Sequence, residues 1–154
     1  MNIVIKLFSM VILTVAVGLS ACSAEDNQTP SSVNSISKSL YDRLGGKSAI
    51  TAVVDEFVAN VGADPRINGR FANTDIPHLK SELVDQICAG TGGPCTYTGK
   101  DMKTKHKDMA ITDADFDALV EDLVHALDKF NVPDQEKNEL LGILGPMRKD
   151  IVTA

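Results

Sequence analysis

The chain of 154 residues has no tryptophan, only 5% aromatic residues and no run of basic side chains. Its 15 basic residues stand against 21 acidic ones, which gives a net charge of −6. A surface that binds nucleic acid needs clustered lysine and arginine or a row of aromatic rings, so no nucleic-acid partner is expected. Three cysteines are too few for a small protein built on disulfides. The remaining composition, 44% hydrophobic and 23% charged, is that of an ordinary globular protein of one domain.

The sequence also lacks the short motifs of common enzymes. It contains no Gly-x-Ser-x-Gly, no phosphate-binding loop and no dinucleotide fingerprint. Its three histidines, His78, His106 and His125, include no pair four residues apart, and there is no Cys-x-x-Cys. Cys88, Cys95 and His106 are a conceivable set of zinc ligands, but their spacings match no common zinc site. Conventional hydrolase and phosphotransferase functions therefore have no support.

The N-terminus is typical of an export signal. Lys6 precedes the apolar run Leu7–Val17, which is too short for a comfortable membrane span. The string Leu19-Ser20-Ala21-Cys22 then resembles the lipobox of bacterial lipoprotein precursors. This resemblance implies a lipoprotein signal peptide over residues 1–21, acylation of Cys22, and a periplasm-facing protein anchored by that lipid to a membrane of the bacterial cell envelope. An uncleaved signal anchor and a secreted protein without lipid are the alternatives.

The rest of the chain divides into a polar stretch and a helical domain. Residues 22–39 are rich in serine and lack any apolar period, which predicts a flexible tether. From residue 40 to 154 apolar residues recur at intervals of three and four, and no β-hairpin pattern occurs, so we predict an all-α domain. The predicted apolar helix faces are Ile50, Val53, Val54, Phe57, Val58 and Val61; Ile76, Leu79, Leu83 and Ile87; Phe116, Leu119, Val120, Leu123, Leu127 and Phe130; and Leu140, Leu144, Met147 and Ile151.

Local signals mark the ends of these helices. Asp75 is placed to cap the second helix, and Thr112 with Asp115 forms a capping-box pattern at the start of the third. The pair Gly145-Pro146 is expected to kink the last helix, because proline removes a main-chain hydrogen bond.

Between the second and third predicted helices lies the glycine-rich segment Gly90–Gly99, which cannot be a regular helix. The short segment Lys100–Lys107 follows it and carries Met102 and His106 on one helical face. A single histidine on an apolar face is usually only a packing residue. The motifs around His106 point instead to a functional role.

Motifs in the same order along the chain resemble those of the group 1 (N-type) truncated haemoglobins. They are Leu40-Tyr41-Asp42-Arg43-Leu44-Gly45-Gly46, Asp64-Pro65-Arg66-Ile67 with Phe71, Gly92-Gly93-Pro94 with Tyr97-Thr98-Gly99, Met102 with His106, Val132-Pro133, and Pro146. The resemblance covers nearly all of residues 40–154. It implies a truncated globin domain, a two-over-two helical sandwich that binds one haem b (iron protoporphyrin IX) with His106 as the ligand of the iron.

A haem needs an apolar slot with polar groups at its mouth for two carboxylates. The slot is expected to be lined by Phe57, Val58, Phe71, Leu79, Leu83 and Met102. Thr74, Lys80 and Tyr97 are the candidates for the polar mouth. His78 is expected to point towards solvent, and His125 to pack or face water, so neither is given a role.

The resemblance implies a protein that reversibly binds diatomic gases, namely oxygen, nitric oxide or carbon monoxide. It also allows an enzyme that converts nitric oxide to nitrate, which needs an electron donor, here an unknown reductase. A peroxidase-like haem enzyme and a haem-carrying lipoprotein are further alternatives for an exported haem protein.

The chain departs from the family on the side of the slot where a gas binds. Many members have a tyrosine at the position of Val58, and often a glutamine at that of Leu83. Leu79 is apolar as well, so oxygen gains no strong hydrogen bond and fast oxygen release is expected. Gln86, one turn further along the helix, either compensates or faces solvent.

Cys88 and Cys95 flank the loop that precedes His106. Because an exported protein lies in an oxidising compartment and only six residues separate the two cysteines, we predict a disulfide between them. The alternative is a pair of buried thiols that act as small hydrophobic side chains.

Overall fold

The computed structural model describes residues 38–154. The predictions for the signal peptide over residues 1–21, for Cys22 and for most of the tether lie outside the described residues. Within residues 38–154 every regular element is helical, and no strand occurs. No helix in this part of the chain is long and apolar enough to cross a membrane. The prediction of an all-α domain is confirmed.

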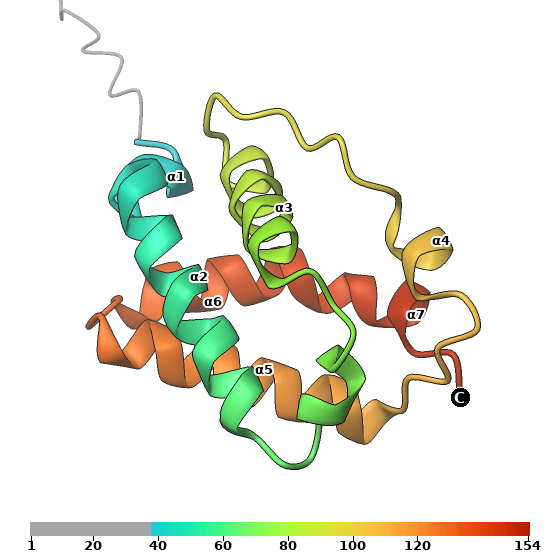
Figure 1. Cartoon of the computed structure of the whole chain (residues 1–154). Coiled ribbons are helices and arrows are strands. Elements are labelled where there is room, and N and C mark those ends of the chain that lie inside the picture. Colours follow the sequence, from blue (N-terminus) through green and yellow to red (C-terminus); the bar gives the residue numbers. More distant parts are fainter. Residues whose placement is uncertain (1–37) are drawn as a thin grey trace, which may run out of the picture. The chain divides into compact units, whose positions relative to one another are not determined.

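The elements follow one another along the chain in an order that can be traced by colour in Figure 1. They are α1 (Leu40–Arg43), α2 (Gly46–Ala63), the 3₁₀ turn η1 (Asn68–Phe71), α3 (Ile76–Gly90), α4 (Met102–His106), α5 (Asp113–Lys129), α6 (Asp134–Leu144), the 3₁₀ turn η2 (Gly145–Met147) and α7 (Arg148–Ile151). The long loop between α3 and α4 is the glycine-rich segment, which is irregular as predicted.

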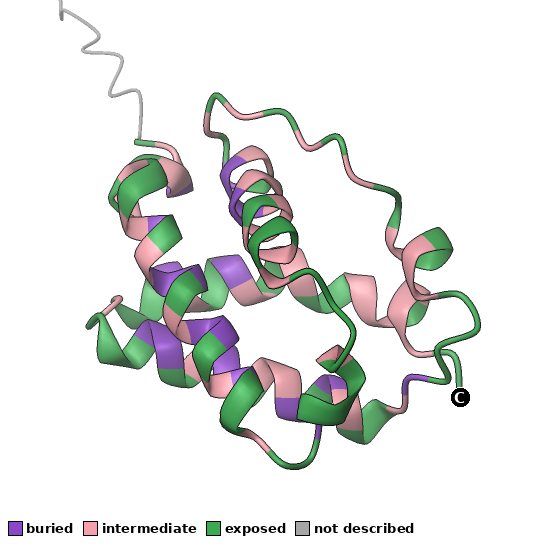
Figure 2. Cartoon of the chain, viewed as in Figure 1, coloured by how far each residue is buried: buried purple, intermediate pink, exposed green. Residues whose placement is uncertain are grey.

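Helix α2 forms the centre of the core. It packs against both α3 and α5, and the buried positions gather on the facing sides of these helices (Figure 2). Its buried residues are Ile50, Val53, Val54, Phe57, Val58 and Val61, the face predicted from their spacing. Helices α2 and α3 thus make one pair and α5 with α6 and α7 the other, which is the two-over-two arrangement.

The predicted helix signals are present. The Asp75 side chain caps α3 by accepting a hydrogen bond from the main-chain nitrogen of His78 at 3.1 Å. Thr112 and Asp115 form the reciprocal capping box at the start of α5. The kink expected at Gly145-Pro146 takes the form of η2, which separates α6 from α7.

Two apolar faces differ from a simple buried stripe. On α3, Ile87 is buried in the core, whereas Leu79 and Leu83 are only half-buried, because they line an open cavity. On α5, Phe130 was predicted to extend the buried face but is 44% exposed. Phe130 is the C-cap residue of α5, where the chain turns away from the helical path and carries the ring off the core.

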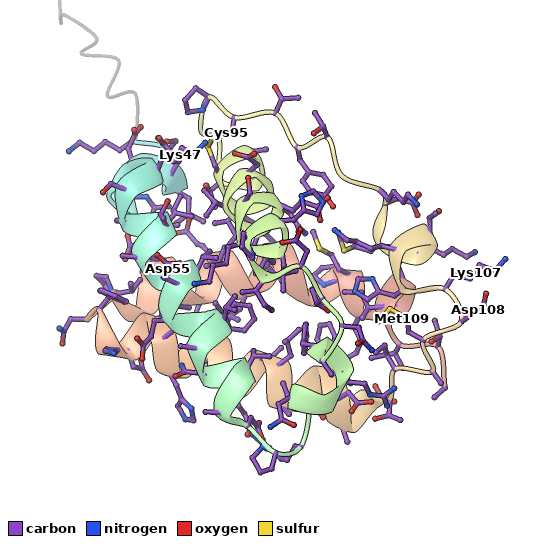
Figure 3. All side chains as sticks on the ribbon, viewed as in Figure 1. Lys47, Asp55, Cys95, Lys107, Asp108 and Met109 are labelled. Carbon is purple, nitrogen blue, oxygen red and sulfur yellow. A yellow bond between two sulfur atoms is a disulfide. The ribbon has the colours of Figure 1, made fainter. Side chains whose placement is uncertain are left out.

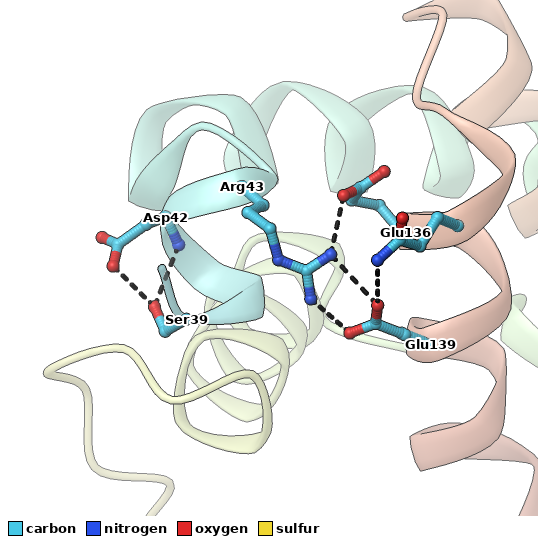
Figure 4. Close-up of polar contacts among 6 residues, drawn as sticks. Ser39, Asp42, Arg43, Glu136 and Glu139 are labelled. Atoms are coloured by element: carbon cyan, nitrogen blue, oxygen red, sulfur yellow. Dashed lines mark hydrogen bonds and ion pairs between the residues drawn. The ribbon is translucent and has the colours of Figure 1, made fainter. Parts of the chain in front are cut away.

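Helix α1 is held to α6 by charged hydrogen bonds. Arg43 Nη1 lies 2.7 Å from Glu136 Oε1 and 3.0 Å from Glu139 Oε1, and its second nitrogen pairs with the same Glu139 carboxylate (Figure 4). Between α1 and α2 the chain turns through Gly45 and Gly46, whose φ angles of 93° and 75° are strained for any other residue. The Gly-Gly pair of the opening motif therefore allows the tight turn between α1 and α2.

Cys88 at the end of α3 and Cys95 in the following loop are joined by a disulfide, with their Cα atoms 5.7 Å apart. The predicted bridge is confirmed, and these sulfurs are therefore not available as zinc ligands beside His106. The bridge encloses Gly93, where a Cβ atom would lie 2.5 Å from the Tyr41 ring and 2.7 Å from the Cys88 sulfur. Only glycine fits there, so the start of the loop is pinned against both α1 and α3.

Candidate functional site

A cavity with about 1150 Å³ of empty space, including its open mouth, lies among the helices. Its apolar walls come from η1, η2 and every helix except α1, and α6 contributes only its last residue. The apolar residues that line it are Phe57, Val58, Val61, Phe71, Ile76, Leu79, Leu83, Ile87, Met102, Phe116, Leu119, Val120, Leu123, Leu144, Met147 and Ile151. Among its described lining residues only Gln86, Lys105 and His106 carry polar side chains. A large apolar cavity with a few polar groups is the usual form of a cofactor site.

His106 is held in one orientation by its own helix. Its Nδ1 atom lies 2.8 Å from the main-chain carbonyl oxygen of Met102. Because a carbonyl oxygen only accepts hydrogen bonds, Nδ1 must carry the ring proton, and Nε2 keeps a lone pair. Nε2 makes no hydrogen bond within residues 38–154. A histidine fixed in this way by a carbonyl partner is the usual form of a metal ligand.

Helix α4, which carries His106, is only five residues long and begins at the N-cap residue Asp101. The Asp101 carboxylate accepts a hydrogen bond from the main-chain nitrogen of Thr104 at 2.9 Å. This hydrogen bond, with a further one that the Thr104 side chain donates, holds the pKa of Asp101 below its ordinary value. The helix also packs against α7.

A single histidine suits a metal ion whose other ligands come from a cofactor. Within the described part of the chain, no group of three His, Cys, Asp or Glu side chains is placed to hold a metal ion. His106 alone can supply one nitrogen from the cavity wall, which suits a porphyrin that brings the other four. The apolar walls suit its flat ring. The residues present therefore fit haem b.

Most of the residues predicted to contact haem come together at this cavity. Phe57, Val58, Phe71, Leu79, Leu83, Met102 and His106 all line it. On the walls formed by α2 and α3, the positions Val58, Leu79 and Leu83 offer no hydrogen-bond donor, as their side chains are hydrocarbon.

The three residues predicted for the polar mouth do not line the cavity. Lys80 Nζ lies 2.8 Å from a carboxylate oxygen of Asp55 on α2 (Asp55 is labelled in Figure 3). The Tyr97 hydroxyl donates to the main-chain oxygen of Lys100 at 3.0 Å, and Thr74 is exposed. Their contact with haem carboxylates stays a prediction that the geometry does not favour.

The other two histidines lie outside the cavity. The His78 side chain is 68% exposed, as expected from its position beside Leu79. His125 is also exposed, on α5.

Two polar lining residues were missed or left open by the sequence. Gln86 does not face solvent: it is half-buried, and its Nε2 atom donates to the Met147 sulfur at 3.2 Å. Lys105 lines the cavity and forms an ion pair with Glu82 of α3. The Glu82 carboxylate has its pKa lowered, first by the hydrogen bond from Lys105 and further by the nearby positive charges. Its position next to His106 was the only local signal for Lys105.

This all-helical arrangement with a single histidine at an apolar cavity is that of a globin. A family model described as "Bacterial-like globin" matches residues 39–153. The chain is 37% identical over 115 residues to a group 1 truncated hemoglobin of Mycolicibacterium paratuberculosis, covering 75% of this chain and 85% of that protein.

Solved structures agree with the sequence matches. The truncated hemoglobin of Tetrahymena pyriformis in its Fe(III) form is 35% identical, with a TM-score of 0.73 over 76% of this chain and 100% of that chain. A 2/2 hemoglobin of a Synechococcus species with covalently attached heme is also 35% identical, with a TM-score of 0.71 over 75% and 98% of the two chains. The chain belongs to the group 1 truncated haemoglobin family, and haem b is the cofactor of this fold.

Proposed function

We propose that the chain holds haem b through His106 and reversibly binds a diatomic gas, either oxygen, nitric oxide or carbon monoxide. The observation that carries this proposal is the hydrogen bond between His106 Nδ1 and the Met102 carbonyl oxygen, which leaves Nε2 as the ligand atom at an apolar cavity. When bound, haem would supply an iron atom that His106 holds and that can bind a gas molecule.

The chain's own residues prepare this chemistry in two ways. The hydrocarbon walls would exclude water from the flat faces of a bound haem. The main-chain partner of His106 fixes its tautomer before the cofactor arrives, so no ring flip is needed on binding. Redox turnover, such as the conversion of nitric oxide to nitrate, would need a separate electron donor as a partner.

Absorption spectra of the purified protein test the proposal. We expect the wild-type chain to bind one equivalent of added haem and to show a Soret band. In the ferrous protein this band should shift on addition of carbon monoxide. His106→Ala should lose this spectrum, whereas the matched control His125→Ala, at an exposed position on α5, should keep it. A His106→Ala protein with full haem and an unchanged Soret band would refute the assignment.

We further propose that the protein works in the bacterial cell envelope, anchored by a lipid on Cys22. Two observations support this location: the Leu19-Ser20-Ala21-Cys22 string, and the Cys88–Cys95 disulfide, since disulfides persist in oxidising compartments. Radiolabelled palmitate should enter the full chain and be lost in Cys22→Ala. Cys22→Ala that keeps the label, or a wild-type chain that never takes it up, would refute the anchor.

A further inference from the structure

Lys105 is the one lysine or arginine among the described residues that line the cavity. Its Nζ atom is paired with the Glu82 carboxylate, which reaches across from α3 to α4. Both side chains are partly buried, with 30% of Lys105 and 19% of Glu82 exposed. The other oxygen of Glu82 lies 3.5 Å from His78 Nε2 on the solvent side. Among the described lining residues, the one ammonium group is therefore already paired with a carboxylate of the protein itself.

The lysine of α3 forms an ion pair elsewhere. Lys80, two residues before Glu82 on α3, pairs with Asp55 on α2 and does not line the cavity. A ligand that carries carboxylates thus meets one cation among the described lining residues, Lys105, and the anion paired with it, Glu82.

We propose that Glu82 and Lys105 form an ionic clasp between α3 and α4, and that haem carboxylates compete with Glu82 for Lys105. This inference rests on the proposed haem binding and deepens it. The haem carboxylates take the Lys105 ammonium group as their partner, and the Glu82 carboxylate is left as a like charge close to them. Two negative charges that lie close together in a partly buried site repel each other. Glu82 therefore shortens the time for which the cavity holds haem. The clasp makes the bound cofactor readily exchangeable.

The rate of haem release measures the clasp directly. The full chain is loaded with haem, mixed with excess apomyoglobin as acceptor, and followed by the change in Soret absorbance. Glu82→Gln removes the competing charge and should slow release about three- to tenfold, the effect of one charge pair at a partly exposed site. Lys105→Gln removes the partner of the haem carboxylates and should speed release by a similar factor.

Asp85→Asn is the matched control, because it removes the same charge one turn away on α3. Asp85 pairs with Lys47 on α2 at 3.0 Å and does not line the cavity, so its variant should release haem at the wild-type rate. Circular dichroism of each variant confirms that the helices are intact before loading.

Haem dimethyl ester, whose carboxylates are blocked, separates charge from packing. With this ligand Glu82→Gln and the wild-type chain should release at the same rate. Equal release rates of Glu82→Gln and wild type with ordinary haem, or faster release from Glu82→Gln, would overturn the proposed clasp. A wild-type chain that takes up no haem at all would instead overturn the proposed function.

Discussion

The main-chain oxygen of Met102 lies 2.8 Å from Nδ1 of His106, one helical turn further along α4. No side-chain substitution removes this acceptor, since it belongs to the backbone. The spacing of four residues brings the two groups together only while α4 is helical. The orientation of the proposed iron ligand is therefore a property of a five-residue helix and not of a second side chain.

This relationship can be tested by replacing the side chain with a free ligand. We expect His106→Gly to bind haem when imidazole is added, with the imidazole N–H donating to the Met102 carbonyl oxygen. 1-Methylimidazole has no N–H, so it should bind about three- to tenfold more weakly, the effect of one hydrogen bond. 4-Methylimidazole carries the same methyl group but keeps an N–H, and it controls for size. Equal affinities of imidazole and 1-methylimidazole, measured by spectral titration, would show that the carbonyl oxygen has no such role.

The apolar character of the gas-binding side predicts rapid loss of oxygen. Val58, Leu79 and Leu83 line the cavity without a hydrogen-bond donor, whereas oxygen gains from such a donor more than carbon monoxide does. Val58→Tyr should slow oxygen dissociation by roughly ten- to a hundredfold, since one hydrogen bond to a polarised group contributes about 1–3 kcal/mol. Carbon monoxide dissociation, measured by ligand replacement in a stopped-flow instrument, should change little.

Val58→Phe is the control for this experiment, because it adds the same ring without the hydroxyl group. Gln86 is the remaining amide in the cavity, and its Nε2 atom already donates to the Met147 sulfur. The argument fails if the wild-type protein releases oxygen as slowly as Val58→Tyr does and Gln86→Ala leaves that slow rate unchanged.

The disulfide should contribute to both stability and cofactor retention. Closing so short a loop stabilises a fold by about 2–3 kcal/mol in the chain-entropy model. The Cys88→Ser/Cys95→Ser double variant should therefore unfold at a lower denaturant concentration, and dithiothreitol should shift the wild-type chain in the same direction. Because the enclosed loop leads to α4, haem release should also become faster. Two alkylated cysteines in the corresponding peptide of the unreduced protein, detected by mass spectrometry, would contradict the bridge.

The capping box of α5 gives the domain a predictable acid sensitivity. The main-chain N–H and the hydroxyl of Thr112 donate to the Asp115 carboxylate, and Arg70 lies 2.8 Å away, so the pKa of Asp115 is lowered in the folded state. A lowered pKa means that the stabilisation is complete above the unfolded value of about 3.9 and is lost as the pH falls through the folded value.

Asp115→Ala should therefore lower the free energy of unfolding by about 1 kcal/mol at pH 7, the usual contribution of a helix cap. At pH 2 the difference should be smaller, because the wild-type carboxylate becomes protonated as the pH falls through its lowered pKa. Urea denaturation at both pH values provides the comparison. A deficit that is the same at pH 7 and at pH 2 would mean that Asp115 acts through packing and not through its charge.

The features that the sequence predicted well are those set by local spacing. The buried face of α2 follows from the three- and four-residue intervals between Ile50 and Val61, because a helix has no other way to place them together. The capping residues Asp75 and Thr112 act on atoms within three positions of themselves, so tertiary structure does not alter them.

Ion pairs between side chains on different helices could not be predicted from spacing along the sequence. Lys80 was a candidate for the polar mouth, but its partner Asp55 lies on another helix. Glu82 and Lys105 are 23 positions apart and meet only because α3 and α4 face each other. Spacing along one helix determines which side chains share a face, whereas pairing across helices depends on the crossing of two chain segments.

The shortness of α4 has a consequence for how cofactor binding and folding are linked. A helix of five residues has no stability of its own, and α4 relies on its Asp101 cap and its packing against α7. Such a segment opens locally at a free energy well below that of global unfolding. Coordination through His106 requires the helical form of α4. The observed haem affinity is therefore lowered by the free energy needed to keep these residues helical. Amide hydrogen exchange in α4 should slow markedly on haem binding, while exchange in the core of α2 changes little. A substitution that only strengthens the helix would raise haem affinity without altering a single residue of the cavity wall.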